Sequence, residues 1–329
     1  MAEPNSNPEN QNTSDLPFIR RLVELQGDET DDRFARRWLG ISGTTWYRLK
    51  QNDYQANPET VLHKCEGGLQ ALEDYLAYRE RNGNTGKILR LSIVRQVLDA
   101  IKVANAAIRD RLVLVLTPTG GGKSWTAMAL KEQYPGRICI TEATEPWRKS
   151  YLAACLSLAE SLKLQDVPTN NRLAEKSIID ELTSRPRIVV IDESHYFGPG
   201  SINLVKAILN LTQSTVVLLA IPPLWGRLKS HAWEEAEQLR SRTAATIEMR
   251  EIGLKDLKIF IEDRLPKAES DLNSDYETAL AKIQTSANRF GLWDTIELIT
   301  TNAREEANGQ PLTLNIITSV IALVEKIRR

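Results

Sequence analysis

The stretch "LVLVLTPTGGGKSWTAMAL" (Leu112–Leu130) decides the fold of this chain. It opens with a continuous apolar run, passes through a glycine-rich turn and continues as a helix, which is the order of a buried strand followed by a helix. The turn almost fits G-x-x-x-x-G-K-[ST], a pattern whose backbone amides surround phosphate groups. Thr117 stands where the pattern has its first glycine. The stretch is therefore either a variant phosphate-binding loop or a glycine-rich turn that matches by chance.

The residue types in the turn suit a phosphate ligand. The glycines at 120–122 allow positive φ and close approach of the backbone, and the helix that begins near Lys123 directs its positive dipole end at an anion. Lys123 can reach the outer phosphates, and the Ser124 hydroxyl can ligate Mg²⁺. Pro118 already restricts φ in the turn, so a glycine at Thr117 is helpful rather than essential. We expect a nucleotide to contact Thr117, Pro118, Thr119, Gly120, Gly121, Gly122, Lys123, Ser124 and Trp125.

An acidic motif follows Lys123 by about 69 residues. In "RIVVIDES" (187–194), four apolar residues precede Asp192 and Glu193, and a parallel strand delivers such residues to the carboxyl edge of its sheet, where ligands bind. We expect Asp192 to hold Mg²⁺ near Ser124 and Glu193 to orient or deprotonate the attacking water. The alternative is an ordinary buried strand that ends in two surface acids. His195 either senses the outermost phosphate or is a polar residue that opens the next helix.

Apolar runs alternate with helical stretches around these motifs. Strands are predicted at 111–117, 137–142, 187–193, 214–222 and 246–251, and helices at 123–134, 147–163, 171–184 and 201–213. This alternation indicates the α/β class, with a parallel sheet covered by helices on both faces. The expected domains are a disordered tail (1–16), an N-terminal helical domain (17–82) that ends in the polar linker "RNGNTGK" (81–87), an α/β core (83–251) and a helical C-terminal unit (252–329).

Composition restricts the partners and the location. The 329 residues are 42% hydrophobic and 26% charged, with a formal net charge of −1, so any DNA binding must come from local basic patches. Cys65, Cys139 and Cys155 form no metal-binding spacing. The start "MAEPNSNPENQNTSD" has no apolar core, and no run approaches 18 apolar residues. We therefore expect a cytoplasmic protein with no membrane partner.

With these motifs, the chain from about residue 88 onward resembles the AAA+ ATPases. The resemblance rests on a helical lead-in, the loop "TPTGGGKS", the acidic strand "IVVIDE", a fourth strand and a helical lid. It implies ATP and Mg²⁺ as ligands, Lys123 and Glu193 as catalytic residues, and a homo-oligomer in which a neighbouring subunit donates an arginine finger. The segment "QLRSRTAATIEM" (238–249) matches that place, with Arg242 favoured over Arg240. Either arginine could instead pair with the glutamates at 234, 235 or 237.

Two polar residues expected from the resemblance are missing. No Asn or Thr stands at Ala220–Pro223, where the family has a sensor at the end of the fourth strand. The arginine expected in the lid near "GQPLTLNII" (309–317) is also absent, and Gln310, Thr313 or Asn315 occupy that neighbourhood. These departures favour slow, switch-like ATP hydrolysis over the fast turnover of a motor.

The order of the domains resembles a subgroup, the transposition ATPases of the phage Mu transposition protein B, TnsC and IstB type. This resemblance implies oligomerisation on double-stranded DNA as a helical filament or ring, selection of the target site and activation of a partner transposase. Two alternatives would use the same nucleotide site. One is a helicase loader or replication-initiation ATPase, and the other is an ATP-switched helix-turn-helix transcription regulator.

The segment "FARRWLGISGTTWYRLK" (34–50) indicates a helix-turn-helix, with Trp46 and Leu49 inward and a glycine-containing turn. Residues 33–50 hold five basic residues and no acids, as phosphate contacts require. The alternative is a basic face for protein docking. A second basic segment is "EPWRKSY" (145–151), and Arg227 and Lys229 are weaker candidates. We expect DNA contacts from Arg36, Arg37, Thr44, Thr45, Arg48, Lys50, Arg148 and Lys149.

Overall fold

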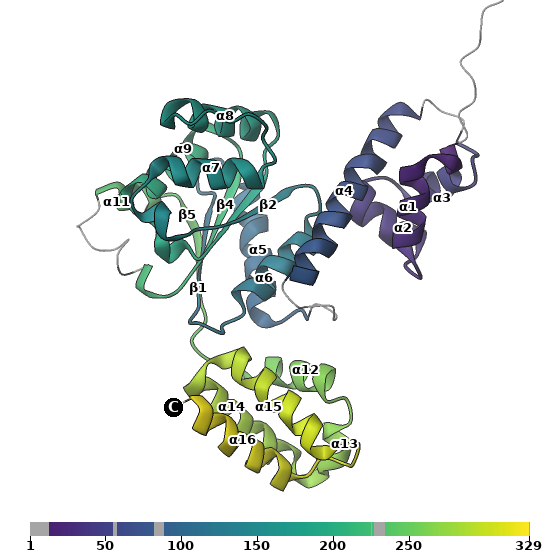
Figure 1. Cartoon of the computed structure of the whole chain (residues 1–329), viewed down its shortest axis with the longest axis vertical. Coiled ribbons are helices and arrows are strands. Elements are labelled where there is room, and N and C mark those ends of the chain that lie inside the picture. The colour runs from purple at the N-terminus through teal and green to yellow at the C-terminus, as the bar shows by residue number, and fades with distance from the viewer. Residues whose placement is uncertain (1–12, 55–57, 82–88, 225, 227–233, 329) are drawn as a thin grey trace, which may run out of the picture. The chain divides into compact units, whose positions relative to one another are not determined.

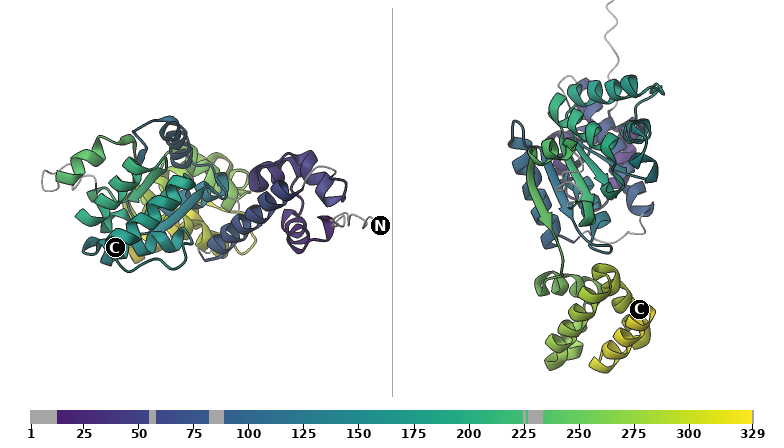
Figure 2. Two further views of the ribbon diagram at one scale, coloured as in Figure 1. Left: turned by 90° about the horizontal axis from the view of Figure 1, so that it is seen from above. Right: turned by 90° about the vertical axis from the view of Figure 1, so that its left-hand side faces the viewer.

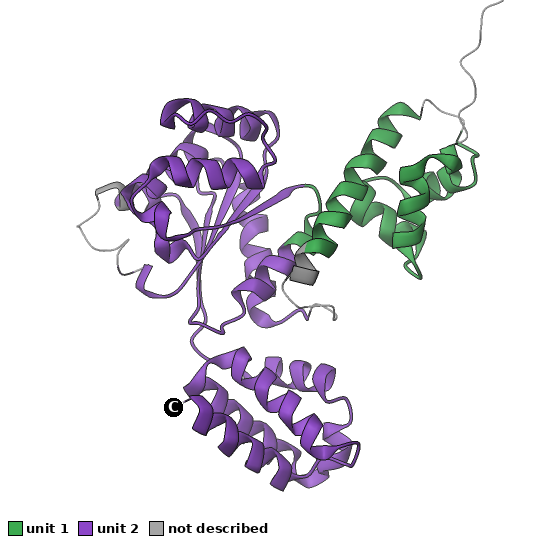
Figure 3. Ribbon diagram, in the orientation of Figure 1, with its two compact units in different colours: residues 1–86, 131–136 green, residues 87–130, 137–329 purple. Residues whose placement is uncertain are grey.

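The structure is a computed structural model, and it describes residues 13–54, 58–81, 89–224, 226 and 234–328 (Figure 1). The chain forms two compact units (Figure 3). The first unit comprises residues 1–86 and 131–136, and the second comprises residues 87–130 and 137–329. The chain therefore returns to the first unit at the end of α6 (Lys123–Gln133) before it continues in the second.

The first unit is helical and has an aromatic core. Its elements are η1 (Thr13–Asp15), α1 (Pro17–Gln26), α2 (Asp31–Phe34), the π-helical segment η2 (Ala35–Leu39), α3 (Gly43–Lys50) and α4 (Glu59–Arg81). The rings of Phe34 and Trp46 lie 5.8 Å apart, and both side chains are fully buried. A Cβ on Gly43 would lie 2.5 Å from the Cα of Asp32, so α2 and α3 cross closely only because position 43 is glycine.

Part of the segment that was expected to be a disordered tail is ordered. Thr13 is buried, and its hydroxyl donates a hydrogen bond to the Leu49 carbonyl at 3.1 Å. This long-range contact fixes η1 against α3, and composition alone does not reveal it. Residues 1–12, and residues 82–87 of the predicted linker, lie outside the described residues.

The second unit contains a five-stranded parallel sheet in the order β2-β3-β4-β1-β5. The strands are β1 (Leu112–Leu116), β2 (Ile138–Glu142), β3 (Ile188–Asp192), β4 (Thr215–Ala220) and β5 (Thr243–Glu248). The predicted α/β class is therefore confirmed. β5 begins at Thr243 rather than at residue 246. Residues 243–245 join the strand because Thr243 pairs with Leu112 of β1, although they form no long apolar run.

Helices cover both faces of the sheet, as Figure 2 shows. Successive strand residues point to opposite faces. Leu112, Leu114 and Leu116 belong to one buried cluster with residues of α7 (Tyr151–Ser161), α8 (Asn171–Ser184) and α9 (Pro199–Leu211). α5 (Ser92–Ala106) packs against β1, β4 and β5. The short η3 (Glu145–Arg148) and η4 (Ser194–Tyr196) follow β2 and β3, and α11 (Glu234–Arg240) precedes β5.

A helical region, which we call the lid, follows β5. It consists of α12 (Leu254–Arg264), α13 (Ala268–Leu272), η5 (Asn273–Asp275), α14 (Tyr276–Phe290), α15 (Leu292–Ala307) and α16 (Leu314–Arg328). The buried Asp256 of α12 accepts hydrogen bonds from the Ser92 amide at 3.0 Å and the Ser92 hydroxyl at 2.8 Å. This carboxylate caps the start of α5 and ties it to the lid. None of the helices among the described residues has the length and apolar character needed to cross a membrane.

Candidate nucleotide-binding site

The glycine-rich turn joins β1 to α6 at the carboxyl edge of the sheet. Gly120 and Gly122 have φ of +73° and +84°, where a side chain would be strained. A Cβ on Gly121 would lie 2.6 Å from the Cβ of Thr117. Thr117 itself prolongs the sheet, since its amide donates to the Ala220 carbonyl at 2.9 Å. Thr117 therefore has an ordinary backbone conformation that any residue can adopt. The three glycines occupy the part of the turn where a positive φ or close approach excludes a side chain.

The lysine of the turn meets the acidic motif. Lys123 is only 8% exposed, and its Nζ lies 3.7 Å from Oε1 of Glu193. A buried ammonium group is costly without a nearby anion, so the pair stabilises Lys123 in its position. Glu193 has φ of 50° and ψ of 33°, a left-handed conformation that costs about 1 kcal/mol or more for a residue with a side chain. Such strained residues cluster at functional sites.

Asp192 ends β3 and is suited to a divalent cation. Burial raises the pKa of its carboxyl group to about 6, although the Glu193 amide donates to its Oδ1 at 2.7 Å. Burial disfavours the anionic carboxylate, and the charge of Lys123 and the Glu193 amide offset this only in part. Ser124 is exposed at the start of α6, and Mg²⁺ takes carboxylate and hydroxyl oxygens together with phosphates and water. Ser124 and Asp192 would hold the ion, which when bound neutralises phosphate charge.

Several buried polar atoms around the turn lack a partner within the described parts of the chain. They are Oγ1 of Thr117, Nε1 of Trp293 and Oγ1 of Thr295. Buried polar groups are nearly always hydrogen-bonded, and each exception calls for an explanation. Phosphate oxygens and their hydrating waters would supply the missing partners, so the residues present fit a bound nucleotide.

The start of α15 brings the lid against the turn. The Trp293 amide donates to the Gly120 carbonyl at 3.0 Å, and a Cβ on Gly120 would lie 2.2 Å from the Gly291 carbonyl oxygen. The sequence had no signal for this contact beyond the glycines themselves. Gly120 must therefore be glycine for two reasons, its positive φ and the close approach of the lid.

The part of the lid that contacts the turn is the start of α15, whereas the segment 309–317, where the resemblance expects an arginine, lies elsewhere in the lid. The segment 309–317 precedes or begins α16, whose other end brings the Arg328 guanidinium to the Phe290 carbonyl at 3.3 Å. A helix of 15 residues is about 22 Å long. Gln310, Thr313 and Asn315 are therefore at the end of α16 away from Gly291, and the antiparallel packing of the lid helices is the physical reason.

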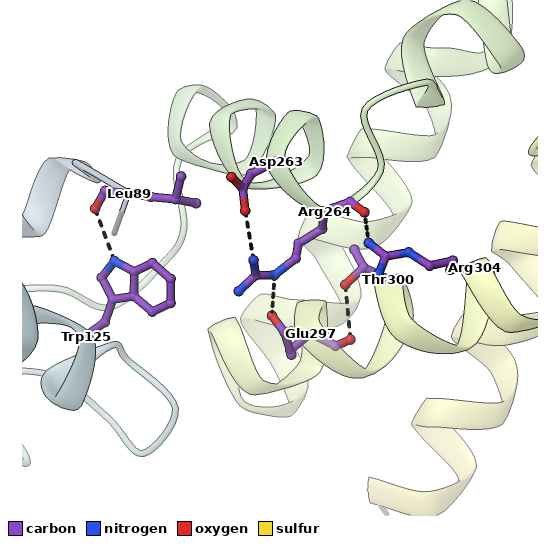
Figure 4. A network of polar contacts seen from close by, with 7 residues as sticks. All are labelled: Leu89, Trp125, Asp263, Arg264, Glu297, Thr300 and Arg304. Atoms are coloured by element: carbon purple, nitrogen blue, oxygen red, sulfur yellow. Dashed lines mark hydrogen bonds and ion pairs between the residues drawn. The ribbon is translucent and has the colours of Figure 1, made fainter. Parts of the chain in front are cut away.

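A cation–π contact joins Arg264 of α12 to Trp125 of α6, and ion pairs join Arg264 to acidic residues of the lid (Figure 4). The Arg264 guanidinium lies 5.9 Å from the ring centroid of Trp125, and it pairs with Asp263 at 2.8 Å and with Glu297 at 3.2 Å. The Trp125 indole donates to the Leu89 carbonyl at 3.1 Å. Nucleotide contact by Trp125 stays a prediction, while its indole N–H already has a protein partner.

The candidate arginine fingers lie at the opposite edge of the sheet. The Arg242 carbonyl accepts a hydrogen bond from the Leu112 amide at 3.0 Å, and Arg240 ends α11 just before it. The strand from Leu112 to Thr117 spans about 16 Å. The position of Arg242 therefore suits contact with the site of another subunit rather than with its own.

The basic face of the first unit is largely neutralised within the unit. Ion pairs join Arg33 to Glu29, Arg36 to Asp32, Arg37 to Glu29 and Glu132, and Lys50 to Asp31. Residues 33–50 contain no acidic residue, so this segment alone did not reveal these partners. Most of them lie at 29–32, about one helical turn earlier. Arg48 and Thr44 are exposed, and Arg48 has no ion pair within the described part of the unit. Thr45 is half-buried, and its hydroxyl lies 2.8 Å from the Ser42 hydroxyl.

The interior of the predicted helix-turn-helix segment has the expected pattern. Trp46 and Leu49 are buried, and Gly40 has φ of +64° in the turn between η2 and α3. Ser42 caps α3 by accepting a hydrogen bond from the Thr45 amide at 3.1 Å. These contacts establish the local geometry, and they do not depend on DNA binding.

The second predicted DNA segment packs next to the acidic motif. Arg148 pairs with Glu145 at 3.2 Å and lies 5.7 Å from the ring centroid of Tyr196, while Lys149 is exposed. His195 Nδ1 lies 2.9 Å from Glu193 Oε2, so His195 contacts the candidate base itself. Arg227 and Lys229 lie outside the described residues.

Comparisons with known proteins agree with this architecture. Residues 108–228 match a protein family described as the AAA domain. No curated protein is significantly similar to the sequence. The crystal structure of Cdc6p from Pyrobaculum aerophilum is similar with a TM-score of 0.51 and 16% identity, over 68% of this chain and 65% of that one. The second unit therefore has the AAA+ P-loop fold.

A further similar structure is the Orc1 protein of Aeropyrum pernix in complex with DNA. It has a TM-score of 0.49 and 17% identity over 72% of this chain and 66% of that one. The present chain thus spans about two thirds of the length of each of these two proteins, 65% and 66%.

Proposed function

We propose that this chain is a Mg²⁺-dependent ATPase that assembles on double-stranded DNA, selects a target site and activates a partner transposase. The observation that carries the ATPase part is the buried Lys123 in contact with Glu193 at the carboxyl edge of the sheet. Lys123 would hold the outer phosphates, and Glu193 would accept a proton from the attacking water. ATP and Mg²⁺ supply the phosphoanhydride bond and the neutralising charge when they are bound.

The position of the arginines supports assembly into an oligomer. Arg242, in preference to Arg240, would stabilise the charge on phosphate bound to a neighbouring subunit, because it lies about 16 Å of strand away from its own turn. Each subunit would then need a neighbour for full activity, in a filament or a ring. The segment Ala220–Pro223 offers no polar side chain at the end of β4, which supports slow, switch-like hydrolysis.

DNA would be held by exposed basic residues of both units. Arg48 and Thr44 of α3 support this reading for the first unit, and Arg148 and Lys149 support it for the second. Contacts of this kind go to phosphates and carry no sequence information. We therefore propose extended binding with little sequence preference.

Light scattering with duplex DNA tests this function. Mg²⁺ and ATP should shift the wild-type protein from small species to DNA-dependent oligomers. Lys123→Ala should abolish the shift, because it removes the phosphate-binding charge. Lys176→Ala is the matched control, since Lys176 is 66% exposed and pairs with Asp180 on the outer side of α8. An unchanged particle size in the wild-type protein would contradict the proposal.

The ion pairs of the first unit favour a second candidate function for that unit. A face whose cations are already paired binds phosphates less strongly than a free basic face, so the unit would dock on a protein. A helicase loader or replication-initiation ATPase of this kind would capture its helicase in a pull-down without a transposase. A helix-turn-helix transcription regulator would instead protect one operator in footprinting, whereas the assembly proposed above would protect an extended region.

A further inference from the structure

A tryptophan of the lid faces the phosphate-binding turn. Trp293 is 7% exposed, and its ring packs on Phe260 with centroids 5.2 Å apart. A Cβ on Gly122 would lie 3.2 Å from Cδ1 and 3.5 Å from Nε1 of Trp293. The polar edge of the indole therefore lies against Gly122, the residue before Lys123.

The indole N–H is buried without a partner. Trp293 Nε1 has no acceptor among the residues that the structure describes, although a tryptophan N–H can only donate. The hydroxyl of Thr295, two residues further along α15, is fully buried and also lacks a partner within those residues. A buried donor without an acceptor destabilises a fold, so this arrangement calls for an acceptor that arrives with a ligand.

We propose that the Trp293 indole donates a hydrogen bond to a phosphate oxygen of the nucleotide held by the turn. The inference rests on the proposed ATPase function and assigns a lid contact at the same site. Phosphate is the favoured acceptor because Gly122 and Lys123 belong to the part of the turn whose amides surround phosphates. The Trp293 amide already holds the Gly120 carbonyl, so one residue would bind both the turn and its ligand.

The neighbouring Asp294 places a negative charge next to the turn. A Cβ on Gly120 would lie 3.0 Å from Oδ2 of Asp294, so the start of α15 also brings a carboxylate to the turn. That negative charge opposes phosphate binding. The indole N–H is then an attractive part of the lid contact, and its loss should be measurable as weaker nucleotide binding.

Calorimetric titration of Trp293→Phe tests the proposal, because phenylalanine keeps an aromatic ring while it removes the N–H donor together with part of the indole volume. We expect binding of Mg²⁺-ATP, and of tripolyphosphate as the probe without a base, to weaken by roughly 10-fold. Trp38→Phe is the matched control, since Trp38 is also 7% exposed but lies in the first unit. Its nucleotide affinity should equal that of the wild-type protein.

Thermal unfolding with and without tripolyphosphate separates this role from a purely structural one. Substitution of a purely structural tryptophan would lower the melting temperature equally with and without ligand, whereas the proposed contact predicts that Trp293→Phe also loses part of the stabilisation that tripolyphosphate gives the wild-type protein. Unchanged affinity for both probes would overturn the inference. A loss of affinity for ATP without a loss for tripolyphosphate would also overturn it, because the contact would then be to the base of the nucleotide. A wild-type protein that binds neither probe would instead refute the proposed ATPase function.

Discussion

At the scale of single residues, unfavourable features gather at one edge of the sheet. Lys123 is a buried cation, Glu193 adopts a left-handed conformation and Asp192 is an acid whose pKa is raised by burial. The conformation of Glu193 and the burial of Asp192 each lower the stability of the nucleotide-free protein, whereas the ion pair with Glu193 offsets part of the cost of burying Lys123. Their concentration around a turn of three glycines is explained by a ligand that carries both phosphate and a divalent cation.

Asp192→Asn should stabilise the nucleotide-free protein. The pKa of Asp192 is raised from 3.8 to about 6 in the folded state, so the folded state binds more protons and the free energy of unfolding falls as the pH rises through this window. At pH 7.5 the substitution should raise the free energy of unfolding by about 1–3 kcal/mol. Denaturant unfolding from pH 4 to pH 8 measures this change.

The same substitution should remove the stabilisation that Mg²⁺ adds to nucleotide binding, because an amide is a poor ligand for this ion. Thermal shift with ATP, with and without Mg²⁺, provides that readout. A variant that is less stable than the wild-type protein at pH 7.5 would show that Asp192 is a structural acid and not a ligand.

At the scale of elements, the ion pairs of α2, η2 and α3 restrict the predicted basic surface of the first unit. Asp32 and Arg36 are one turn apart in sequence, as are Glu29 and Arg33, and such spacing predicts helical ion pairs. Lys50 and Asp31 are joined only by the fold. The basic surface proposed for DNA contact is therefore narrower than the sequence suggested, and Arg48 is the exposed cation of α3 with no ion pair among the described residues.

Arg48→Ala should weaken DNA binding by the first unit. It should also reduce the slope of the logarithm of the DNA-binding constant against the logarithm of the salt concentration by about one. Arg36→Ala should have a smaller effect, because Arg36 already pairs with Asp32 at 2.8 Å. Fluorescence anisotropy at several salt concentrations compares the two variants. Equal losses for both would mean that the ion pairs do not restrict the basic face, and no loss for either would favour protein docking.

The sequence predicted local structure well and long-range placement poorly. The apolar runs located β1 to β4, because buried parallel strands need continuous apolar segments, while β5 lies three residues earlier than predicted. The two motifs identified Lys123 and Glu193, which the structure brings together. The lid contact at Gly291 and Trp293 was missed. It depends on how α14, α15 and α16 pack, and no local pattern records which end of a helix faces the turn.

At the scale of the whole molecule, the two proposed sites lie at opposite edges of the sheet. The carboxyl edge carries the candidate nucleotide site, and the opposite edge carries Arg242 next to the start of β1. A subunit with this arrangement is asymmetric, so head-to-tail contact would bring the arginine edge of one copy to the nucleotide edge of the next. Such contact leads to rings or helical filaments.

Mixing two inactive variants should restore ATP hydrolysis if Arg242 acts on a neighbouring subunit. Lys123→Ala retains the arginine but lacks a working turn, and Arg242→Ala retains the turn but lacks the arginine. Each variant alone should lose activity by about 10³-fold or more. An equimolar mixture should recover a substantial part of the wild-type rate, measured as phosphate release, because some interfaces combine both intact parts. A mixture as inactive as its components would exclude this role for Arg242.

The central claim, that the turn and the acidic motif form one ATP-hydrolysing site, is tested most directly by phosphate release from Glu193→Gln. Glutamine keeps the shape of the side chain and cannot accept the proton of the attacking water. We expect this variant to bind Mg²⁺-ATP about as tightly as the wild-type protein while its turnover falls by about 10²-fold or more. Turnover at the wild-type rate, with ATP bound equally well, would contradict this claim.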